Sequence, residues 1–569
     1  MANINLSEAF AVARFGPFGG INAQPKDREG CILSDIKNFR ITESGTLEKR
    51  SGFSELLSLP GVPRAIAAVS EYEMFVLIGG QIYLSSLLYK TNTSVSTVSG
   101  SFGDASFFKF GGDVYLLDGY EIYRYNGSIF TPVEGYVPLY FKDASPSSPA
   151  QIHEPLNLLS SRYRVSFKLG DTYHEKLSLP FAAVSIDRVL RNGVDADVDE
   201  YFLELGGEYI DVTSSSLQPN DRVEFYLTMD IHPLERDPLL SCARAVTFGT
   251  GKSSHAPSSV AFYRGLDQKK IFTTRPVNSA DYLKIKKLYS DLSTLYVTED
   301  DAATLDGDIT AASPCGSSLA VFLDGSAYLA EENSGFGTKL TCMSRTHGCS
   351  VNDGVITFES SPVTMSDSGI FLWRPHDTYD GEYTAECISI PVCHLLPTHI
   401  AGGFIYYHRS KNEIWCQPSN TEILVRNTLT DDWYTFEGFF PRFIFEMKGR
   451  TVFVTNNTLY GFSESDVTDA GRAIEVSISA RRISFGDLNR KKRLARAIIL
   501  CARDSTFDLT VTDSNGSVVD LTLTCDGSEM MGYIEKRLPT KRARYYSLNL
   551  SAKGIDKTTI DSLILTAVK

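Results

Sequence analysis

Residues 74–84 read MFVLIGGQIYL, and in this stretch two runs of apolar and aromatic residues flank a Gly-Gly pair. β-Branched and aromatic residues suit pleated sheet, and glycine supplies the positive φ angles that a two-residue hairpin turn requires. The stretch therefore predicts two short antiparallel strands joined by a tight turn.

The same pattern recurs along the chain, with Asp-Gly, Asn-Gly or Asn-Asn pairs near the turns. Further copies lie at residues 114–125, 319–329, 369–373, 404–416 and 451–462. A small β-unit that recurs at spacings of about 30–50 residues is typical of a β-propeller, in which each small sheet is one blade. The sequence therefore predicts a mainly β fold built on a β-propeller. The copies carry no WD or kelch motif, so the number of blades stays open.

Two regions fall outside this repeat. Residues 142–157 (KDASPSSPAQIHEPLN) are rich in proline and serine and predict a linker. Short strand-like segments with turn residues every ~8–12 positions follow it, which indicates a small β-sandwich. The predicted organisation is an N-terminal arm (residues 1–30), the first part of the propeller (31–145), an inserted β-sandwich (146–240), the remainder of the propeller (241–468) and a C-terminal β-domain (469–569).

The charge balance is acidic. The 569 residues include 55 Lys and Arg and 69 Asp and Glu, which gives a formal net charge of −14. Such a surface repels DNA phosphates, so a basic genome-binding protein is excluded, although DNA can still pass nearby. The sequence has neither a run of about 18 apolar residues nor a leader pattern, so we expect no membrane span and no secretory signal. The ten scattered cysteines are predicted to be reduced, small core residues.

Three patterns contain residue types of ligand sites, and we interpret them as ordinary turns and loops. Residues 248–254 (FGTGKSS) lack the first glycine of a phosphate-binding loop, because Val246 stands in its place. An acidic loop at residues 298–309 lacks the order of an EF-hand, and calcium binding stays an alternative there. Zinc-ligand types occur at a spacing foreign to compact zinc modules, although converging strands could still gather them. These residues are Cys387, Cys393, His394 and His399.

A propeller also raises the question of a glycosidase. The turn motif of propeller sialidases is S-x-D-x-G-x-x-[TW], and this chain does not match it, because Met365 precedes Asp367 and Trp373 falls one position late. The G-x-S-x-G elbow of serine hydrolases is also missing. We therefore predict no enzyme activity, no cofactor and no metal. A glycan-binding or glycan-cleaving propeller remains the alternative, since paired carboxylates cannot be recognised without a structure.

One cluster of basic residues runs against the acidic balance. Residues 490–493 read RKKR, and three further arginines lie within ten positions of this run. Such a run is either a solvated turn or a contact surface for an acidic neighbouring subunit. Aromatic residues among the glycines of the N-terminal arm are too few to form a core alone, so they need contact with another element of the chain or with another subunit. The candidate subunit-interface residues are Arg490, Lys491, Lys492, Arg493, Phe15 and Phe18.

Motifs in a shared order connect the sequence with a known family. Residues 18–22 (FGGIN), 34–40 (SDIKNFR) and 43–53 (ESGTLEKRSGF) resemble the opening of tailed-phage virion proteins. That opening contains three motifs in this order: GG-hydrophobic-N, N-hydrophobic-R and G-x-L-x-K-R-x-G-F. Later segments resemble the same proteins in the same order, at residues 156–164, 308–323, 367–372 and 483–493. The family is the tail nozzle, or packaged-DNA stabilisation, group of short-tailed phages.

The resemblance spans nearly the whole chain and implies a structural protein of the virion, made in the host cytoplasm. It implies a hexameric ring of identical subunits that closes the tail channel, with adaptor and fibre proteins as neighbours. Packaged double-stranded DNA would pass through the lumen without sequence-specific binding. Loops that narrow the lumen would retain the genome, and a conformational change on host contact would release it. The family has no catalytic residues to carry over.

Overall fold

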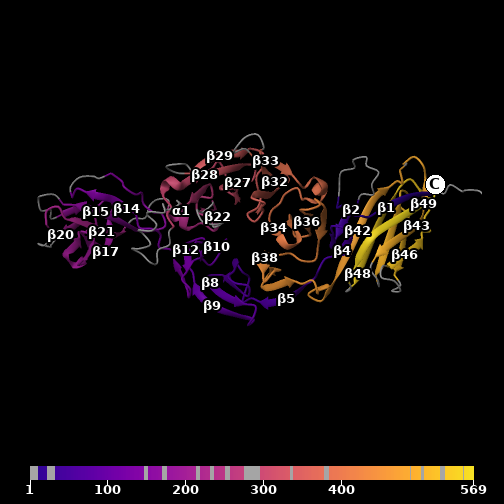
Figure 1. The fold of residues 1–569 in the computed structure, drawn as a ribbon, viewed down its shortest axis with the longest axis horizontal. Coiled ribbons are helices and arrows are strands. Elements are labelled where there is room, and N and C mark those ends of the chain that lie inside the picture. Colours follow the sequence, from indigo (N-terminus) through magenta and orange to yellow (C-terminus); the bar gives the residue numbers. More distant parts are fainter. Residues whose placement is uncertain are drawn as a thin grey trace, which may run out of the picture.

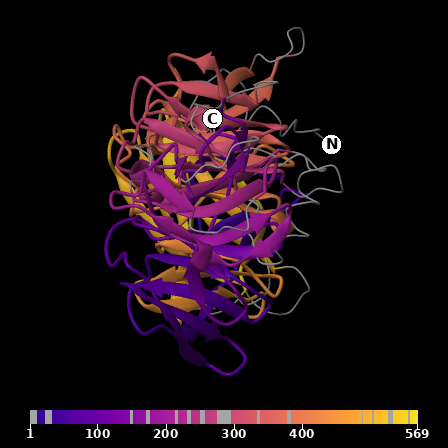
Figure 2. The same ribbon diagram turned by 90° about the vertical axis from the view of Figure 1, so that its left-hand side faces the viewer.

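The computed structural model describes residues 10–21, 33–146, 151–169, 176–212, 218–230, 236–249, 257–274, 295–332, 338–376, 383–486, 488–501, 505–525, 532–554 and 557–568. Figure 1 shows three regions along the long axis of the molecule, with the propeller in the middle. Figure 2 looks along that axis, so the three regions overlap in the view. None of the helices in the described ranges is long and apolar enough to cross a membrane.

The middle region is a β-propeller, as the repeat predicted. In the described part of the chain, seven antiparallel groups of four strands follow one another as blades; five are separate sheets, and two are parts of a 14-stranded sheet. Blade 1 consists of β6 (Ala65–Ala68), β7 (Glu73–Ile78), β8 (Gln81–Ser86) and β9 (Thr91–Thr97). Blade 2 consists of β10 (Ser106–Phe110), β11 (Asp113–Leu117), β12 (Ile122–Tyr125) and β13 (Phe130–Pro132). Blade 3 consists of β22 (Arg244–Phe248), β23 (Ser259–Tyr263), β24 (Lys270–Thr273) and β25 (Ala302–Thr304).

The other four blades repeat the pattern. Blades 4 and 5 consist of β26 (Ala311–Cys315), β27 (Ser318–Phe322), β28 (Ala327–Glu332) and β29 (Thr338–Ser344); and β30 (Val355–Phe358), β31 (Ser361–Ser366), β32 (Gly369–Pro375) and β33 (Tyr383–Cys387). Blades 6 and 7 consist of β34 (Phe404–His408), β35 (Glu413–Gln417), β36 (Ile423–Asn427) and β37 (Trp433–Phe436); and β38 (Phe443–Met447), β39 (Arg450–Thr455), β40 (Thr458–Phe462) and β5 (Phe53–Ser58). The short helices are α1 (Arg236–Leu240) and the 3-10 turns η1 (Val198–Glu200), η2 (Glu299–Asp301), η3 (Ile390–Leu395) and η4 (Arg409–Lys411).

Strand β5 closes the ring. The first strand of each blade contacts that of a neighbouring blade around most of the ring, and β38 of blade 7 contacts β6 of blade 1. Strand β5 precedes blade 1 in the sequence, yet it pairs antiparallel with β40 as the outer strand of blade 7. Hydrogen bonds between the beginning and the end of the propeller therefore hold the circle together.

Both ends of the chain build two further sheets, which we call the terminal sheets. One contains β1 (Phe10–Phe15), β3 (Phe39–Ile41), β4 (Leu47–Lys49), β43 (Lys492–Cys501), β46 (Gly532–Arg537), β47 (Arg542–Ala543) and β49 (Thr559–Val568). The other contains β2 (Leu33–Lys37), β42 (Arg472–Ile483), β44 (Thr506–Asp513), β45 (Val518–Thr524) and β48 (Tyr546–Gly554), with β41 (Thr468–Asp469) leading into it. The prediction that the propeller begins at residue 31 is therefore wrong, because β2, β3 and β4 pair with C-terminal strands.

A third group of strands follows blade 2 and precedes blade 3 in the sequence, and we call residues 139–229 the inserted region. One sheet contains β14 (Leu139–Ala144), β15 (Arg162–Lys168), β17 (Ala183–Arg191), β18 (Val194–Ala196) and β21 (Arg222–Met229). A second contains β16 (Lys176–Ser178), β19 (Tyr201–Leu203) and β20 (Tyr209–Val212), and residues of both share one hydrophobic cluster. The predicted boundary at residue 146 would cut β14 from its partner β15.

Candidate functional site

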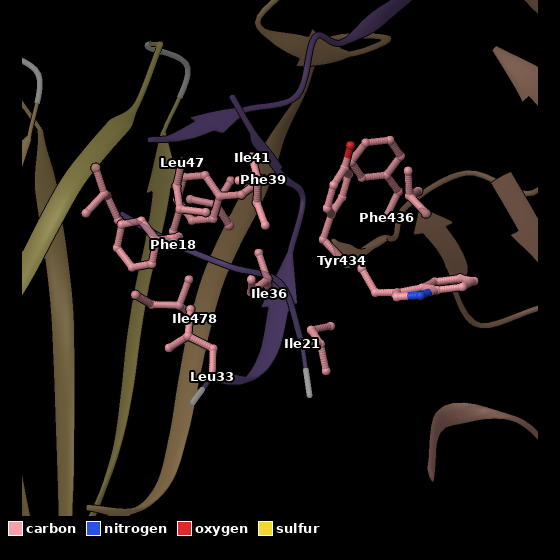
Figure 3. Close-up of a cluster of buried hydrophobic side chains, with 14 of the residues drawn as sticks. Phe18, Ile21, Leu33, Ile36, Phe39, Ile41, Leu47, Tyr434, Phe436 and Ile478 are labelled. Carbon is pink, nitrogen blue, oxygen red and sulfur yellow. The ribbon is translucent and has the colours of Figure 1, made fainter. Parts of the chain in front are cut away.

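The N-terminal segment that carries the family motifs lies where the propeller meets the terminal sheets, and we call this contact the junction. Strand β2 pairs parallel with β37 of blade 6 and antiparallel with β42, so hydrogen bonding runs without a break from the blade into a terminal sheet. Figure 3 shows Ile21 and Ile36 between Ile478 on one side and Tyr434 on the other. All four side chains are buried. A continuous core and a continuous sheet make the junction stiff.

The motif glycines are required by close approaches at the junction. Gly45 has a φ of +76°, and a Cβ there would collide with the ring of Pro17. A Cβ on Gly52 would collide with the carbonyl oxygen of Thr468. These two positions of the G-x-L-x-K-R-x-G-F motif therefore accept only glycine, and the physical reason is chain packing.

Arg50 of the same motif is the centre of a buried ionic network. Its guanidinium donates to both carboxylate oxygens of Asp469, at 2.9 and 2.5 Å, and to the side chain of Asn38 at 2.8 Å. A further hydrogen bond of 2.8 Å goes to the carbonyl of Glu437. Only 1% of the Arg50 side chain is exposed. The network ties β4 and β5 to the end of blade 6 and to the start of the terminal sheets.

A second buried pair joins β3 to blade 6. Arg40 donates to both oxygens of Glu413, at 2.6 and 3.2 Å. The indole of Trp415 and the hydroxyl of Tyr434 donate to the same carboxylate, each at 2.8 Å. Burial raises the pKa of Glu413, but Arg40 and these hydrogen bonds outweigh it and hold the pKa below its usual value. Burial, together with the Glu413 charge, raises the pKa of Tyr434 well above its usual value, so Tyr434 stays a donor.

A polar pocket of about 270 Å³ opens beside this pair, between blades 6 and 7. Its cationic side chains are Arg40, Lys411 and Arg450, and Lys411 pairs with Glu464 at 2.6 Å. His408 lies in the wall and shares a hydrogen bond of 3.0 Å with Thr451. Burial lowers the pKa of His408 to about 4, so its imidazole is neutral at pH 7. The carboxylates near this pocket, Glu413 and Glu464, are both held by cations, whereas glycoside hydrolysis needs a proton-donating acid beside a second carboxylate.

An exposed histidine–aspartate pair lies on one face of the propeller. His399 Nδ1 lies 2.8 Å from Asp367, and the backbone N–H of Ile400 donates to the same carboxylate at 2.7 Å. Asp367 sits in the turn between β31 and β32, whereas the other two residues belong to the connection leading to blade 6. The hydrogen bond that His399 donates to Asp367 raises the pKa of His399.

Equivalent contacts in other blades explain this pair as structural. Asp324 in the turn between β27 and β28 accepts a hydrogen bond of 2.7 Å from Ser350, which lies in the connection to blade 5. Asp118 in the turn between β11 and β12 accepts one of 2.6 Å from the N–H of Gly100, in the connection from blade 1. Aspartates of the hairpin turns thus fasten the connections between blades. These are the Asp residues of the Asp-Gly and Asp-Ser-Gly turns in the repeat.

The residue types that left zinc or calcium binding open in the sequence do not come together as a set of ligands in the described residues. Across the described ranges, no group of three or more His, Cys, Asp or Glu side chains could hold an ion. In the acidic loop, Asp301 instead accepts hydrogen bonds from Thr298. Most of residues 248–254, including Lys252, lies outside the described residues. Of the described cysteines, Cys342 and Cys393 are exposed, which differs from the prediction that all are core residues.

The structure separates the candidate interface residues. Arg490, Lys491 and Arg493 are exposed, whereas Lys492 is 2% exposed and donates to the carbonyl of Ser484. Its side chain points inward because residues alternate between the two faces of β43.

The two aromatic residues of the N-terminal arm also lie inside. Phe15 and Phe18 are 2% and 5% exposed, within the core of the terminal sheets. The prediction that they face another subunit is wrong, because β1 pairs with β49 of the same chain and turns Phe15 into that core.

Sequence reasoning missed the partners at the junction. Arg40 and Arg50 stand in the quoted motifs, but Glu413 and Asp469 lie 373 and 419 positions further along the chain. No local spacing can indicate pairs this distant. An arginine flanked by apolar strand residues, as in NFRI at residues 38–41, was the available signal of a buried cation.

Comparisons with known proteins do not assign the chain to a family. No family model matches the sequence, and no curated protein matches it. Among solved structures, the WD40 β-propeller domain of Doa1 is 10% identical, with 73% of this chain and 98% of that chain covered and a TM-score of 0.35.

Two further solved structures are similar at the same low level. An exo-β-1,3-galactanase from Phanerochaete chrysosporium is 7% identical, with 83% and 96% covered and a TM-score of 0.18. PorZ, a surface component of the type-IX secretion system of Porphyromonas gingivalis, is 12% identical, with 90% and 82% covered and a TM-score of 0.23. At these TM-scores the likenesses carry no argument, and the propeller assignment rests on the strand order.

Proposed function

We propose that the protein is a structural component of a tailed-phage virion, in which identical subunits form a ring around the tail DNA channel. One observation carries the proposal. The motifs that resemble the tail nozzle family supply the residues of the junction, including Arg40, Gly45, Arg50 and Gly52. The opening motifs of the family likeness therefore lie where the propeller is joined to the terminal sheets, which suits a mechanical role.

A rigid junction suits a wall that holds packaged DNA. Two buried arginine–carboxylate pairs and an unbroken sheet link the propeller to the terminal sheets. Breaking a buried pair leaves an uncompensated charge and costs about 3–5 kcal/mol, so bending at this point is strongly opposed. Subunits of this kind transmit force from one end to the other. In the proposed ring they retain the genome until host contact changes their arrangement.

The full chain, purified and imaged by negative-stain electron microscopy, tests the proposal. We expect closed rings with a central lumen wide enough for duplex DNA. Phage particles that lack the protein should package DNA and then lose it, which nuclease sensitivity measures. Rings that never form, together with particles that retain DNA without the protein, would contradict the proposal. Binding or cleavage of a glycan in a screen of purified polysaccharides would favour the alternative function.

A further inference from the structure

Two cysteines lie next to each other where the edge strands β45 and β46 of the two terminal sheets come into contact. Cys501 is the last residue of β43 in one sheet, and Cys525 directly follows β45 in the other. Both are reduced thiols within one shared hydrophobic core, with exposed fractions of 0% and 4%. The two sheets thus bring together two sulfur atoms that belong to different strands.

A glycine makes room for this contact. Gly532 of β46 is paired with Cys501, so the two positions face the same side of the sheet. A Cβ on Gly532 would collide with the sulfur of Cys525, and the Cβ of Cys525 lies 3.3 Å from the same point. The φ angle of Gly532 is not in the left-handed region, so the backbone does not require glycine there. The missing side chain therefore leaves the space that the Cys525 sulfur fills beside Cys501.

The two thiols are close enough to interact directly. They share a hydrogen bond, which places one sulfur beside the other. The backbone N–H of Cys525 donates to the carbonyl of Ser505 at 3.0 Å, and this bond fixes the end of β45 at the core. A disulfide requires Cβ atoms about 3.5–4.5 Å apart and sulfur atoms about 2.05 Å apart. Thiols that already share a hydrogen bond reach this geometry by side-chain rotation and a small approach of the strand ends.

We infer that Cys501 and Cys525 form an oxidation site, at which a small disulfide compound converts the two thiols into a disulfide bond between the terminal sheets. The thiolate of Cys525, the less buried residue, attacks one sulfur of the small disulfide, forms a mixed disulfide and releases one small thiol. The thiolate of Cys501 then attacks the Cys525 sulfur and releases the second small thiol. Two protein thiols are oxidised and one small disulfide is reduced, and the two protons pass from the protein thiols to the released thiols.

Burial makes the site slow to react. The thiolate is the attacking species, and burial, together with the neighbouring Cys525, raises the pKa of Cys501 to about 12. The exposed thiols of Cys342 and Cys393 should therefore react with an oxidant first. Local opening of a strand edge admits the oxidant to the buried pair. Among the described residues, β45 and β46 each pair with a neighbouring strand on one side only, so this is the edge that opens.

The disulfide fastens the edge at which the two terminal sheets meet. It closes a loop of about 25 residues and so removes conformational entropy from the unfolded chain. Cysteines stay reduced in a reducing cytoplasm and form disulfides in oxidising surroundings. In a virion, the bond would form after the particle leaves the cell, and this use alone rests on the proposed function.

Oxidation of the purified full chain with oxidised glutathione at about pH 8 tests the inference. Sub-denaturing urea in the mixture opens the strand edges, and iodoacetamide then traps the remaining thiols. Peptide mass spectrometry without reduction identifies the products. We expect two peptides linked through Cys501 and Cys525, lighter by two hydrogen atoms than the separate peptides. Glutathione on Cys342 and Cys393 shows that the oxidant was active.

Two variants separate the effect of the bond from other effects of oxidation. Cys525→Ala removes one sulfur of the pair, and Cys416→Ala removes a similarly buried cysteine of blade 6. The melting temperature of each protein is compared before and after oxidation, so a loss caused by the substitution itself cancels. Oxidation should raise the melting temperature of the wild type and of Cys416→Ala by about 3–6 °C relative to its effect on Cys525→Ala.

The possible outcomes judge the inference separately from the proposed function. Cys501 and Cys525 that stay unmodified after this treatment, or that carry glutathione one by one, would overturn the oxidation site. A linked pair without a rise in melting temperature would contradict its role in fastening the edge. Rings in micrographs and DNA retention in particles are measured with reduced protein, so none of these results bears on the proposed function. A chain that forms the bond and no ring would refute the proposed function alone.

Discussion

Buried charged side chains hold the propeller to the terminal sheets at the scale of single residues. Arg50 makes hydrogen bonds to two side chains and to backbone carbonyls, and its guanidinium also lies over the ring of Phe439, 5.0 Å from the centroid. The nitrogen atoms of the Arg50 guanidinium are thus all matched with acceptors. Buried polar groups are tolerated only under this condition, because an unmatched one loses its hydration without replacement.

Replacement of Arg50 by methionine should lower the free energy of unfolding by about 3–5 kcal/mol, because Asp469 then remains buried without its partner. Urea denaturation followed by circular dichroism measures the loss. As a control, Arg374→Ala removes an ion pair whose two side chains are 62% and 56% exposed, and should change stability by less than about 1 kcal/mol. Equal effects of the two substitutions would contradict the role given to Arg50.

At the scale of elements, the inserted region is bound to the propeller more closely than its sequence indicates. The chain leaves β14, returns to the propeller and only then enters β15. On this return, Leu158 and Leu159 pack in the core between blades 2 and 3, and the side chain of Asn157 donates to the carbonyls of Tyr136 and Leu295. Asn157 at the end of the proline-rich linker and the two leucines that follow it therefore belong to the propeller.

Two deletions separate the inserted region from these propeller residues. Removal of residues 162–229, with a short glycine-serine bridge, should leave cooperative melting of the propeller. Removal of residues 158–235 also takes Leu158 and Leu159 out of the core, and each buried leucine is worth about 2–5 kcal/mol. The second variant should therefore melt at a clearly lower temperature. Thermal denaturation of the two variants compares them, and identical melting temperatures would show that the buried leucines contribute nothing.

For the whole molecule, the division of hydrophobic cores sets the units of unfolding. One cluster of buried residues extends from blades 5, 6 and 7 through the junction into the terminal sheets. The inserted region has a cluster of its own, formed by strands β15, β17, β20 and β21 among others. Segments that share a core unfold together, whereas segments with separate cores can unfold independently.

Differential scanning calorimetry of the full chain should therefore show two transitions. The propeller and the terminal sheets should contribute one large transition, and the inserted region a smaller one that vanishes in the variant without residues 162–229. Propeller and terminal sheets that melt separately would contradict the stiffness assigned to the junction. The Arg50→Met variant should shift the large transition and leave the small one in place.

The sequence by itself determined hairpins in six of the seven blades, whereas blade 3 contains none of the quoted copies of the repeat. Hairpins such as the one at residues 74–84 are decided within a dozen residues, because alternation and turn glycines act locally, and their recurrence indicates the propeller. Only the tertiary structure decided with which strands the N-terminal and C-terminal segments pair. Strand β5 closes blade 7, β2 to β4 complete the terminal sheets, and Phe15 lies in their core. At the junction, Arg40 and Arg50 find carboxylates 373 and 419 positions away. Pairing between distant segments depends on which strand edges and buried charges the folded chain leaves open, and no local pattern carries that information.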